Sequence, residues 1–335
     1  MANGSIKSLT GVFMGDFAET GRNNKVVVVS GTTASGKTKL GILLAQSFGG
    51  EVISADSMQV YRGMDIGTAK PSIEEREGIP HHMLDVADPS EEYSVARYVE
   101  EASGCAEEIL GRGKLPIVVG GTGLYIDALV AGRTFAAPRD EALREELNQR
   151  YDRLGGEAML VELERVDPER AAVLHPADRK RIVRALETFM LTGETITKHD
   201  EISKGLPPRY SAAHISLSCA DRGRLYERID DRVDEMMEKG LLSEVDGLLR
   251  RDTPIGSSAA QAIGYKELIR HLEGEVSLDE AVALIKMESR RYAKRQLTWF
   301  SRNKDAKWIM WGDEVDFDFA RRFSTEILLN FGIRC

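Results

Sequence analysis

Residues 31–38, with the sequence GTTASGKT, have the composition and spacing of a loop that binds phosphate. They fit the pattern G-x-x-x-x-G-K-[ST], and they lie between a run of valines and a helical apolar pattern. In such loops, consecutive backbone N–H groups and a helix N-terminus form a concave anion site that glycines leave open. Lys37 adds a positive charge, and the Thr38 hydroxyl is placed to hold Mg²⁺. The predicted phosphate-binding residues are Gly31, Thr32, Thr33, Ala34, Ser35, Gly36, Lys37 and Thr38.

Asp56, in the segment ISADSMQVY, is the carboxylate best placed to act on a ligand of that loop. Enzymes that hydrolyse nucleoside triphosphates usually have an Asp at the end of an apolar strand to hold the metal. Here the apolar run at residues 115–119 ends in two glycines instead. Asp56 follows the run at 51–55, and ligands bind at the carboxyl edge of a parallel sheet. We therefore predict that Asp56 accepts a proton, with Ser57 and Gln59 beside it, rather than being a solvated surface acid.

The phosphate loop and Asp56 can lie close together if their strands end at the same edge of one sheet. The order of apolar patterns along the chain predicts such a sheet. Short apolar runs alternate with helical patterns, which predicts a P-loop-containing α/β fold with a doubly wound parallel sheet. The predicted strands span residues 26–30, 51–55, 115–119, 213–219 and 306–310. Helices are predicted at residues 37–48, 94–112 and 314–330, and three or four more, including a long one at 277–301, are expected between the last two strands.

The segment 135–209 has a different pattern from the rest of the chain. It is charged, helical in period and free of strand-like runs, and it ends at Pro207 and Pro208. We predict that it is a helical insertion domain, so that residues 25–134 and 210–335 together make the α/β core with its C-terminal helices. Residues 1–24 are expected to be a mobile tail.

The composition is that of an ordinary globular protein, with 335 residues and a net charge of −9. An acidic average argues only weakly against a nucleic-acid partner, because phosphate contacts need a local basic face rather than a basic whole. The three cysteines have neither disulfide nor zinc spacing, and no apolar stretch approaches the length of a membrane span. We therefore expect a cytoplasmic protein without a membrane partner, and since no feature demands an oligomer, we expect a monomer.

Two clusters of cations interrupt the acidic average. The sequence SRRYAKRQLTWFSRNK, from residue 289, has six cations and no acid, and DRKRIVRAL, from residue 178, has four cations. Cations interleaved with aromatic residues suit neutralisation of an RNA backbone and stacking of unpaired bases. A second interpretation stays open for the aromatic residues, because Tyr292, Leu297 and Phe300 could instead pack in the core of a helix whose basic face is solvated.

Seven segments occur together and in order: GTTASGKT, SADSMQVYRGMDIGTAKP, PHHMLD, VGGTGLY, DRKRIVRALE, QAIGYKE and KRQLTWF. Together they closely resemble the bacterial tRNA dimethylallyltransferases, over roughly residues 26–312. The resemblance implies that the loop holds the diphosphate of dimethylallyl diphosphate. In that family the exocyclic amine of the adenine immediately 3′ of the anticodon, in tRNAs reading codons that begin with U, attacks the first prenyl carbon. Diphosphate then leaves with Mg²⁺.

The resemblance also implies roles for individual residues. Asp56 matches the catalytic Asp of the family, Thr38 the residue that holds Mg²⁺, and Arg232 a residue at the diphosphate. By helical spacing alone, Arg224 is a solvated residue, whereas Arg228 stays open between the two roles. The residues expected to contact the tRNA anticodon stem-loop are Asp56, Ser57, Met58, Gln59, Thr122, Arg144, Lys180, Arg181, Ile182, Val183, Arg184, Gln261, Gly264, Tyr265, Lys294, Arg295, Gln296, Trp299 and Arg302.

Three other functions compete with this one. Prenyl transfer to free AMP, ADP or ATP, as in cytokinin-forming enzymes, uses the same donor but needs neither an insertion domain nor a basic helix. A P-loop small-molecule kinase would use Asp56 as the base on a hydroxyl group, and an RNA-binding protein with a regulatory nucleotide site would leave Asp56 without a role. A metal site at His81 and His82 is not expected, because neighbours in a strand point to opposite faces and no third ligand stands at a suitable spacing.

Overall fold

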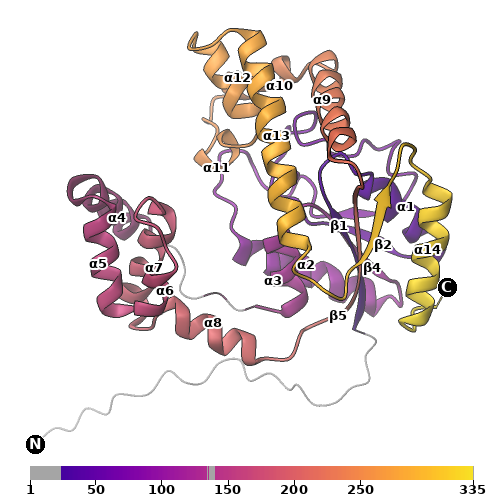
Figure 1. Ribbon diagram of the computed structural model, residues 1–335, viewed down its shortest axis with the longest axis horizontal. Coiled ribbons are helices and arrows are strands. Elements are labelled where there is room, and N and C mark those ends of the chain that lie inside the picture. Colours follow the sequence, from indigo (N-terminus) through magenta and orange to yellow (C-terminus); the bar gives the residue numbers. More distant parts are fainter. Residues whose placement is uncertain (1–23, 134, 136–139, 335) are drawn as a thin grey trace, which may run out of the picture.

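A central sheet of six parallel strands organises the computed structural model, which describes residues 24–133, 135 and 140–334 (Figure 1). The strand order is β3-β2-β4-β1-β5-β6. The strands are β1 (Lys25–Gly31), β2 (Glu51–Ser54), β3 (His81–His82), β4 (Pro116–Val119), β5 (Ser211–Cys219) and β6 (Lys307–Trp311). Because β1 lies between β4 and β5, the loop that follows it leaves from the middle of the sheet.

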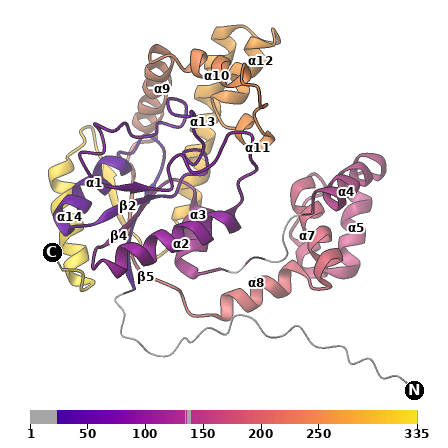
Figure 2. The ribbon, with the colours of Figure 1, turned by 180° about the vertical axis from the view of Figure 1, so that it is seen from behind.

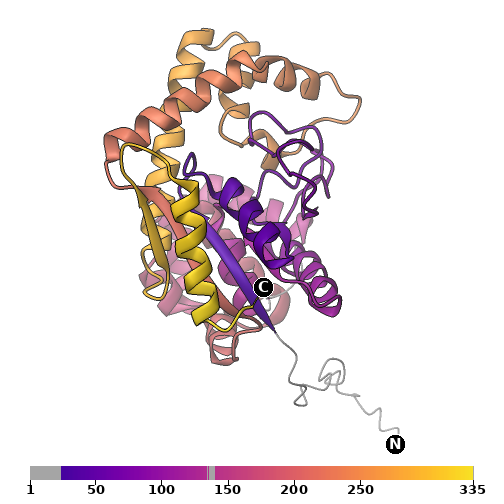
Figure 3. The same cartoon turned by 90° about the vertical axis from the view of Figure 1, so that its right-hand side faces the viewer.

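Helices cover both faces of this sheet. The helices α1 (Lys37–Phe48) and α14 (Phe317–Asn330) pack together on one face (Figure 3), and α2 (Val95–Gly111) and α3 (Gly123–Ala131) lie on the other. Since both faces are covered, the valines of β1 are buried whichever way they point. Five helices follow β5: α9 (Arg222–Glu238), α10 (Leu241–Leu249), α11 (Ser257–Ala260), α12 (Tyr265–Leu272) and α13 (Leu278–Phe300).

A separate group of helices lies between α3 and β5. It contains α4 (Glu141–Leu154), α5 (Gly156–Val166), α6 (Pro168–Ala172), α7 (Arg179–Thr192) and α8 (Ile196–Gly205). Figures 1 and 2 show these helices beside the sheet rather than on it, and they have a core of their own that includes Leu147, Met159, Leu163, Ile182 and Leu186.

The predicted fold class is confirmed, and each of the five predicted strands lies within two residues of its observed bounds. The two-residue strand β3 is an addition, and the described part of the chain has five helices between β5 and β6 instead of three or four. The fifth helix was missed because α11, with four residues, is too short to show a helical period. Residues 1–23, 134 and 136–139 lie outside the described part, and with them the predicted tail and the start of the predicted insertion. Among the described helices, none combines the length and the apolar composition that crossing a bilayer requires.

Candidate functional site

A cleft of about 1210 Å³ lies along the carboxyl ends of the central strands. Its walls come from the segments after β1, β2 and β4 and from helices α9 and α13, which are far apart in the sequence. Carboxyl ends of parallel strands are where ligands bind in open α/β sheets. The cleft therefore brings together the predicted phosphate loop, Asp56 and Arg232.

The part of the phosphate loop that faces this cleft is preorganised for an anion. The backbone is left-handed at Ala34 (φ 58°) and at Gly36 (φ 83°). In the part of the chain that the structure describes, the N–H groups of residues 34–38 have no protein acceptor, so they remain available to a ligand. From behind, the Trp311 indole N–H donates to the Ser35 carbonyl (2.7 Å), and a Cβ at Gly36 would lie 2.8 Å from the ring of Phe317.

The first three residues of the motif have another task. Thr32 is fully buried and its N–H donates to the Leu217 carbonyl (3.1 Å), while Gly31 lies so close to the same residue that a Cβ would be 2.0 Å from that carbonyl oxygen. The Thr33 N–H donates to Oε1 of Gln296 (2.7 Å). The prediction of phosphate contacts is therefore corrected for Gly31, Thr32 and the Thr33 amide, since sheet and helix already occupy these groups.

Lys37, Arg232 and Asp56 lie close enough together in the cleft to affect one another's charge. Burial, and next the repulsion from Arg232, lower the pKa of Lys37 to about 7, although Asp56 opposes this shift. The Lys37 ammonium donates to the Thr32 carbonyl at 2.5 Å. Burial also lowers the pKa of Arg232, against the opposing effect of the acids Asp56, Glu235 and Glu75. Such a pair of desolvated like charges is costly in the free protein and is stabilised by a bound anion.

The Asp56 carboxylate is held by its own turn. Its Oδ1 accepts the N–H groups of Met58 (2.9 Å) and Gln59 (3.3 Å), and the Ser57 N–H donates to Oγ1 of Thr122 (3.0 Å). The turn is thus tied to the start of α3. Oδ2 accepts no hydrogen bond from the residues described, so one carboxylate oxygen of Asp56 can accept a proton from a ligand.

Helix α13 has an outer basic face and an inner face that supports the site. The side chains of Lys294, Arg295 and Arg302 are exposed, as an RNA-binding role requires. Gln296, with 4% of its surface exposed, instead bridges the Thr33 N–H and the Gly121 carbonyl (3.0 Å), and the Trp299 indole N–H donates to Asp127 Oδ2 (2.9 Å). The predicted RNA contact is corrected for the buried Gln296 side chain, whereas that of the half-buried Trp299 stays a prediction.

The predicted RNA-contacting residues of the insertion divide in the same way. Lys180 and Arg181 are exposed, whereas the side chains of Ile182 and Val183 lie in the core of the insertion and cannot reach RNA. Arg144 and Arg184 both hydrogen-bond Glu187, which is completely buried (2.5 and 2.9 Å). Burial alone would raise the pKa of Glu187, but these hydrogen bonds outweigh it and lower the pKa. The two arginines therefore hold the insertion together.

Other predicted contacts are also turned inward. Gln261 is exposed at the end of α11, but Gly264 and Tyr265 are buried. Met58 packs against the core, and both ends of the Gln59 amide are occupied: Oε1 accepts from Ser54 (3.0 Å), and Nε2 donates to loop carbonyls. Gly264 and Tyr265 are therefore removed from the predicted RNA-contacting side chains, whereas Met58 is half-buried and Gln59 lines the cleft, so these two contacts stay predictions.

Arginines and histidines outside this set are placed as follows. Arg224 is exposed and pairs with Glu227 (3.0 Å), whereas Arg228 lines the cleft. His82 Nε2 lies 2.7 Å from Glu51 Oε2, and His81 Nδ1 donates to a backbone carbonyl. These positions leave the role of Arg228 open between the two predicted alternatives.

The side chains present fit a magnesium ion that arrives with a phosphate ligand. Among the described residues, no group of three or more His, Cys, Asp or Glu side chains is arranged to hold a metal. Mg²⁺ at phosphate sites, however, usually takes one or two protein ligands and keeps several waters. Thr38, at the start of α1 and on the wall of the cleft, is the residue that would hold it.

Known proteins resemble this chain over most of its length. Residues 59–304 match the IPP transferase family, and residues 24–89 match the isopentenyl transferase family. The tRNA dimethylallyltransferase of Geobacillus kaustophilus is 50% identical over 88% of this chain and 92% of its own, and that of Acetivibrio thermocellus is 47% identical over 88% and 94%. The crystal structure of the tRNA isopentenylpyrophosphate transferase of Bacillus halodurans superposes with a TM-score of 0.67 at 43% identity, covering 92% of this chain and 97% of its own. A eukaryotic dimethylallyltransferase that acts on tRNA gives a TM-score of 0.78 at 32% identity, covering 92% and 80%.

Proposed function

Since the chain belongs to the IPP transferase family, the family of the tRNA dimethylallyltransferases, we propose that it transfers the dimethylallyl group of dimethylallyl diphosphate to tRNA. The acceptor is the exocyclic amine of the adenine 3′ of the anticodon, in tRNAs reading codons that begin with U. The observation that carries this proposal is that the phosphate loop, Arg232 and Asp56 line one cleft. Cations for a diphosphate and a base for an amine are thereby side by side.

The proposed chemistry follows from these positions. The adenine amine forms a bond to the first prenyl carbon while the bond from that carbon to the diphosphate oxygen breaks. The amine becomes acidic only as its new bond forms, so a carboxylate such as Asp56 can take the proton late in the step. Lys37, Arg232 and the loop N–H groups hold the leaving diphosphate, and Mg²⁺, held by Thr38, would neutralise part of its charge.

A direct assay separates this proposal from its alternatives. Purified protein is given labelled dimethylallyl diphosphate and Mg²⁺, together with either a tRNA reading codons that begin with U or free AMP. We expect label in the tRNA. Label in AMP but not in tRNA would favour the cytokinin-type reaction, and consumption of ATP without prenyl transfer would favour a kinase.

We further propose that the protein works as a cytoplasmic monomer. All the groups assigned to the cleft come from a single chain, so chemistry requires no second copy. Light scattering coupled to size-exclusion chromatography tests this, and a dimeric mass at assay concentrations would contradict it.

The outer face of α13 yields a prediction about RNA affinity. Replacing both Lys294 and Arg295 with alanine should weaken tRNA binding and lower the magnitude of the slope of log K against log salt by about one to two, because two phosphate contacts are lost. Filter binding at several salt concentrations measures the slope. The matched control replaces Arg321 and Arg322, two exposed neighbours on α14, and should leave it unchanged. An unchanged slope in the α13 variant would make the cluster a merely solvated face.

The pKa of Lys37 yields a prediction about pH. Below about pH 7 the free protein holds this ammonium charged, and above it the charge is lost, so diphosphate binding at pH 8 must bring a proton with it. We expect proton uptake of up to about one per site at pH 8 and weaker donor binding as the pH rises. Calorimetry in buffers of different ionisation enthalpy measures the uptake. The Lys37→Arg variant keeps its positive charge at every pH and should bind the diphosphate without proton uptake. Equal proton uptake in both proteins would contradict the assignment of the uptake to Lys37.

A further inference from the structure

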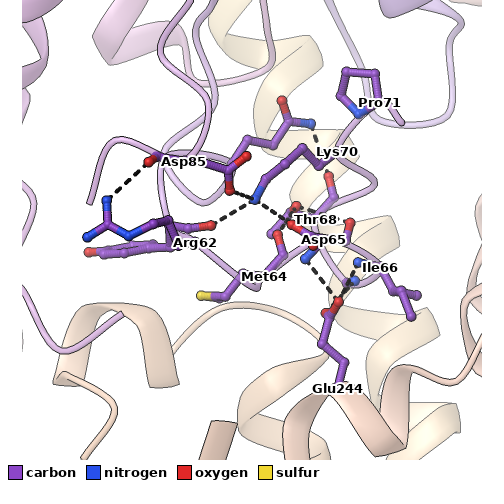
Figure 4. A network of polar contacts seen from close by, with 12 residues as sticks. Arg62, Met64, Asp65, Ile66, Thr68, Lys70, Pro71, Asp85 and Glu244 are labelled. Atoms are coloured by element: carbon purple, nitrogen blue, oxygen red, sulfur yellow. Dashed lines mark hydrogen bonds and ion pairs between the residues drawn. The ribbon is translucent and has the colours of Figure 1, made fainter. Parts of the chain in front are cut away.

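The loop between Asp56 and β3 is braced by a buried lysine. Lys70, whose side chain is 3% exposed, donates to the Tyr61 carbonyl (2.8 Å) and to the carboxylates of Asp65 and Asp85 (2.6 Å each). Figure 4 shows the Lys70 side chain between Asp65 and Asp85. The loop is therefore compact on this side, although it belongs to no helix or strand.

A single carboxylate from another part of the chain holds the opposite side of the loop. Glu244 on α10 accepts three consecutive backbone N–H groups, those of Asp65 (3.0 Å), Ile66 (2.7 Å) and Gly67 (3.1 Å), as Figure 4 shows. Its Oε1 also accepts the hydroxyl of Tyr265 at 2.5 Å. All four hydrogen bonds are made to a carboxylate, and such charge-assisted hydrogen bonds are roughly twice as strong as those between neutral groups.

The first residue of α12 packs against the same turn of the loop. A Cβ at Gly67 would lie 2.5 Å from the Tyr265 ring, so only glycine allows the loop to approach this closely. Tyr265 follows Gln261, the exposed residue at the end of α11, after only three residues. The surface predicted to meet RNA and the loop are thus joined through Tyr265 and Glu244.

The loop in turn reaches Asp56. The carbonyls of Thr68 and Ala69, next to the amides that Glu244 holds, accept from Nε2 of Gln59 (3.2 and 3.3 Å). The Gln59 main-chain N–H donates to the Asp56 carboxylate (3.3 Å). The path from Glu244 to the Asp56 carboxylate therefore consists only of hydrogen bonds and of covalent bonds within one short segment.

We propose that Glu244 is a positioning residue for prenyl transfer, which couples RNA docking at Gln261, at the end of α11, to the orientation of Asp56. This inference rests on the proposed function, because it takes Asp56 as the base and tRNA as the ligand of the surface at Gln261. Glu244 does not line the cleft, so it acts on Asp56 only through the loop.

The kinetic test uses Glu244→Gln. A neutral amide has one oxygen instead of two, and its NH₂ group faces backbone donors, so the loop loses part of its support at constant side-chain size. We expect kcat to fall about 10-fold or more, while the Kd for tRNA changes less than about twofold. Tyr265→Phe should give a smaller loss in the same direction, and the double variant should resemble Glu244→Gln alone. Glu273→Gln, an exposed charge change at the end of α12, is the matched control.

Amide hydrogen exchange gives a second readout that needs no activity. In the natural protein, the amides of Asp65, Ile66 and Gly67 should exchange slowly, and bound tRNA should slow them further; in Glu244→Gln they should exchange quickly with or without tRNA. A wild-type protein that transfers no prenyl group would overturn the proposed function, yet the exchange result would still test the coupling. The inference would be overturned if Glu244→Gln had the kcat of the wild type, or if bound tRNA still slowed amide exchange in this variant. Additive losses of kcat in the double variant would overturn it as well. If Glu244→Gln does not fold, Tyr265→Phe decides by the same two measurements.

Discussion

Replacing Asp56 with alanine should lower the turnover number of prenyl transfer by about 100-fold or more, while the Kd for tRNA stays nearly unchanged. The carboxylate lines the same cleft as Lys37 and Arg232, and its Oδ2 is available to a ligand. Without it, the proton released as the adenine amine forms its new bond must pass to water. We expect the exposed cations on α13 and the insertion to supply the RNA affinity, so binding should survive.

An isosteric change shows whether the base or only its turn is needed. Asp56→Asn keeps an oxygen that can accept the N–H groups of Met58 and Gln59, so the turn is preserved while the basicity is lost. It should be nearly as slow as Asp56→Ala. Asp231→Asn removes a carboxylate from the wall of the same cleft and should change turnover by less than about threefold. Single-turnover transfer at a normal rate in Asp56→Asn would remove Asp56 from the base role.

The location of Asp56 could be predicted because it depends only on local patterns and a topological rule. Valines in β1 form a continuous apolar run since both sheet faces are covered, and each such run ends at the same edge of a parallel sheet. The residue after a run must therefore lie near the phosphate loop. The same reasoning found five strands but missed β3, because two residues carry no pattern.

The inner residues of the motifs were assigned to RNA because a linear motif does not distinguish the two faces of a helix. The spacing does indicate the inward position of Gln296. This residue lies three residues after Ala293 and four before Phe300, on the buried stripe of α13. A polar residue on such a stripe is expected to hold a partner inside the protein. Tyr265, three residues before the buried Leu268, follows the same rule.

No local pattern could have predicted the role of Glu244. Its three backbone partners lie 177 to 179 residues earlier in the chain, and the segment LLSEVDGLL is that of an ordinary amphipathic helix. The same holds for Trp311, which supports the phosphate loop from a distance of 276 residues. Such contacts depend on tertiary packing, which periodicity and motifs do not describe.

Replacing Arg232 with methionine should lower kcat/KM for the prenyl donor by about 10²- to 10³-fold at pH 6.5, because a preorganised cation is lost from the leaving diphosphate. The loss should be smaller at pH 8.5. Arg232 is the second largest cause of the lowered pKa of Lys37, so without it that pKa rises above about 7 and more of the ammonium stays charged at high pH. Steady-state kinetics at the two pH values measures both effects.

The same variant should be more stable than the natural protein. The folded-state pKa of Lys37, about 7, lies below the ordinary value of 10.5, so the penalty on folding is fully present below about pH 7 and disappears above about 10.5. Relieving the repulsion should raise Tm at pH 6.5 and flatten the rise of Tm with pH. Arg228→Met, one turn earlier on α9 and also on the cleft wall, is the matched control. Equal losses of kcat/KM in both variants, with no gain in Tm, would mean that total positive charge matters and the position of Arg232 does not.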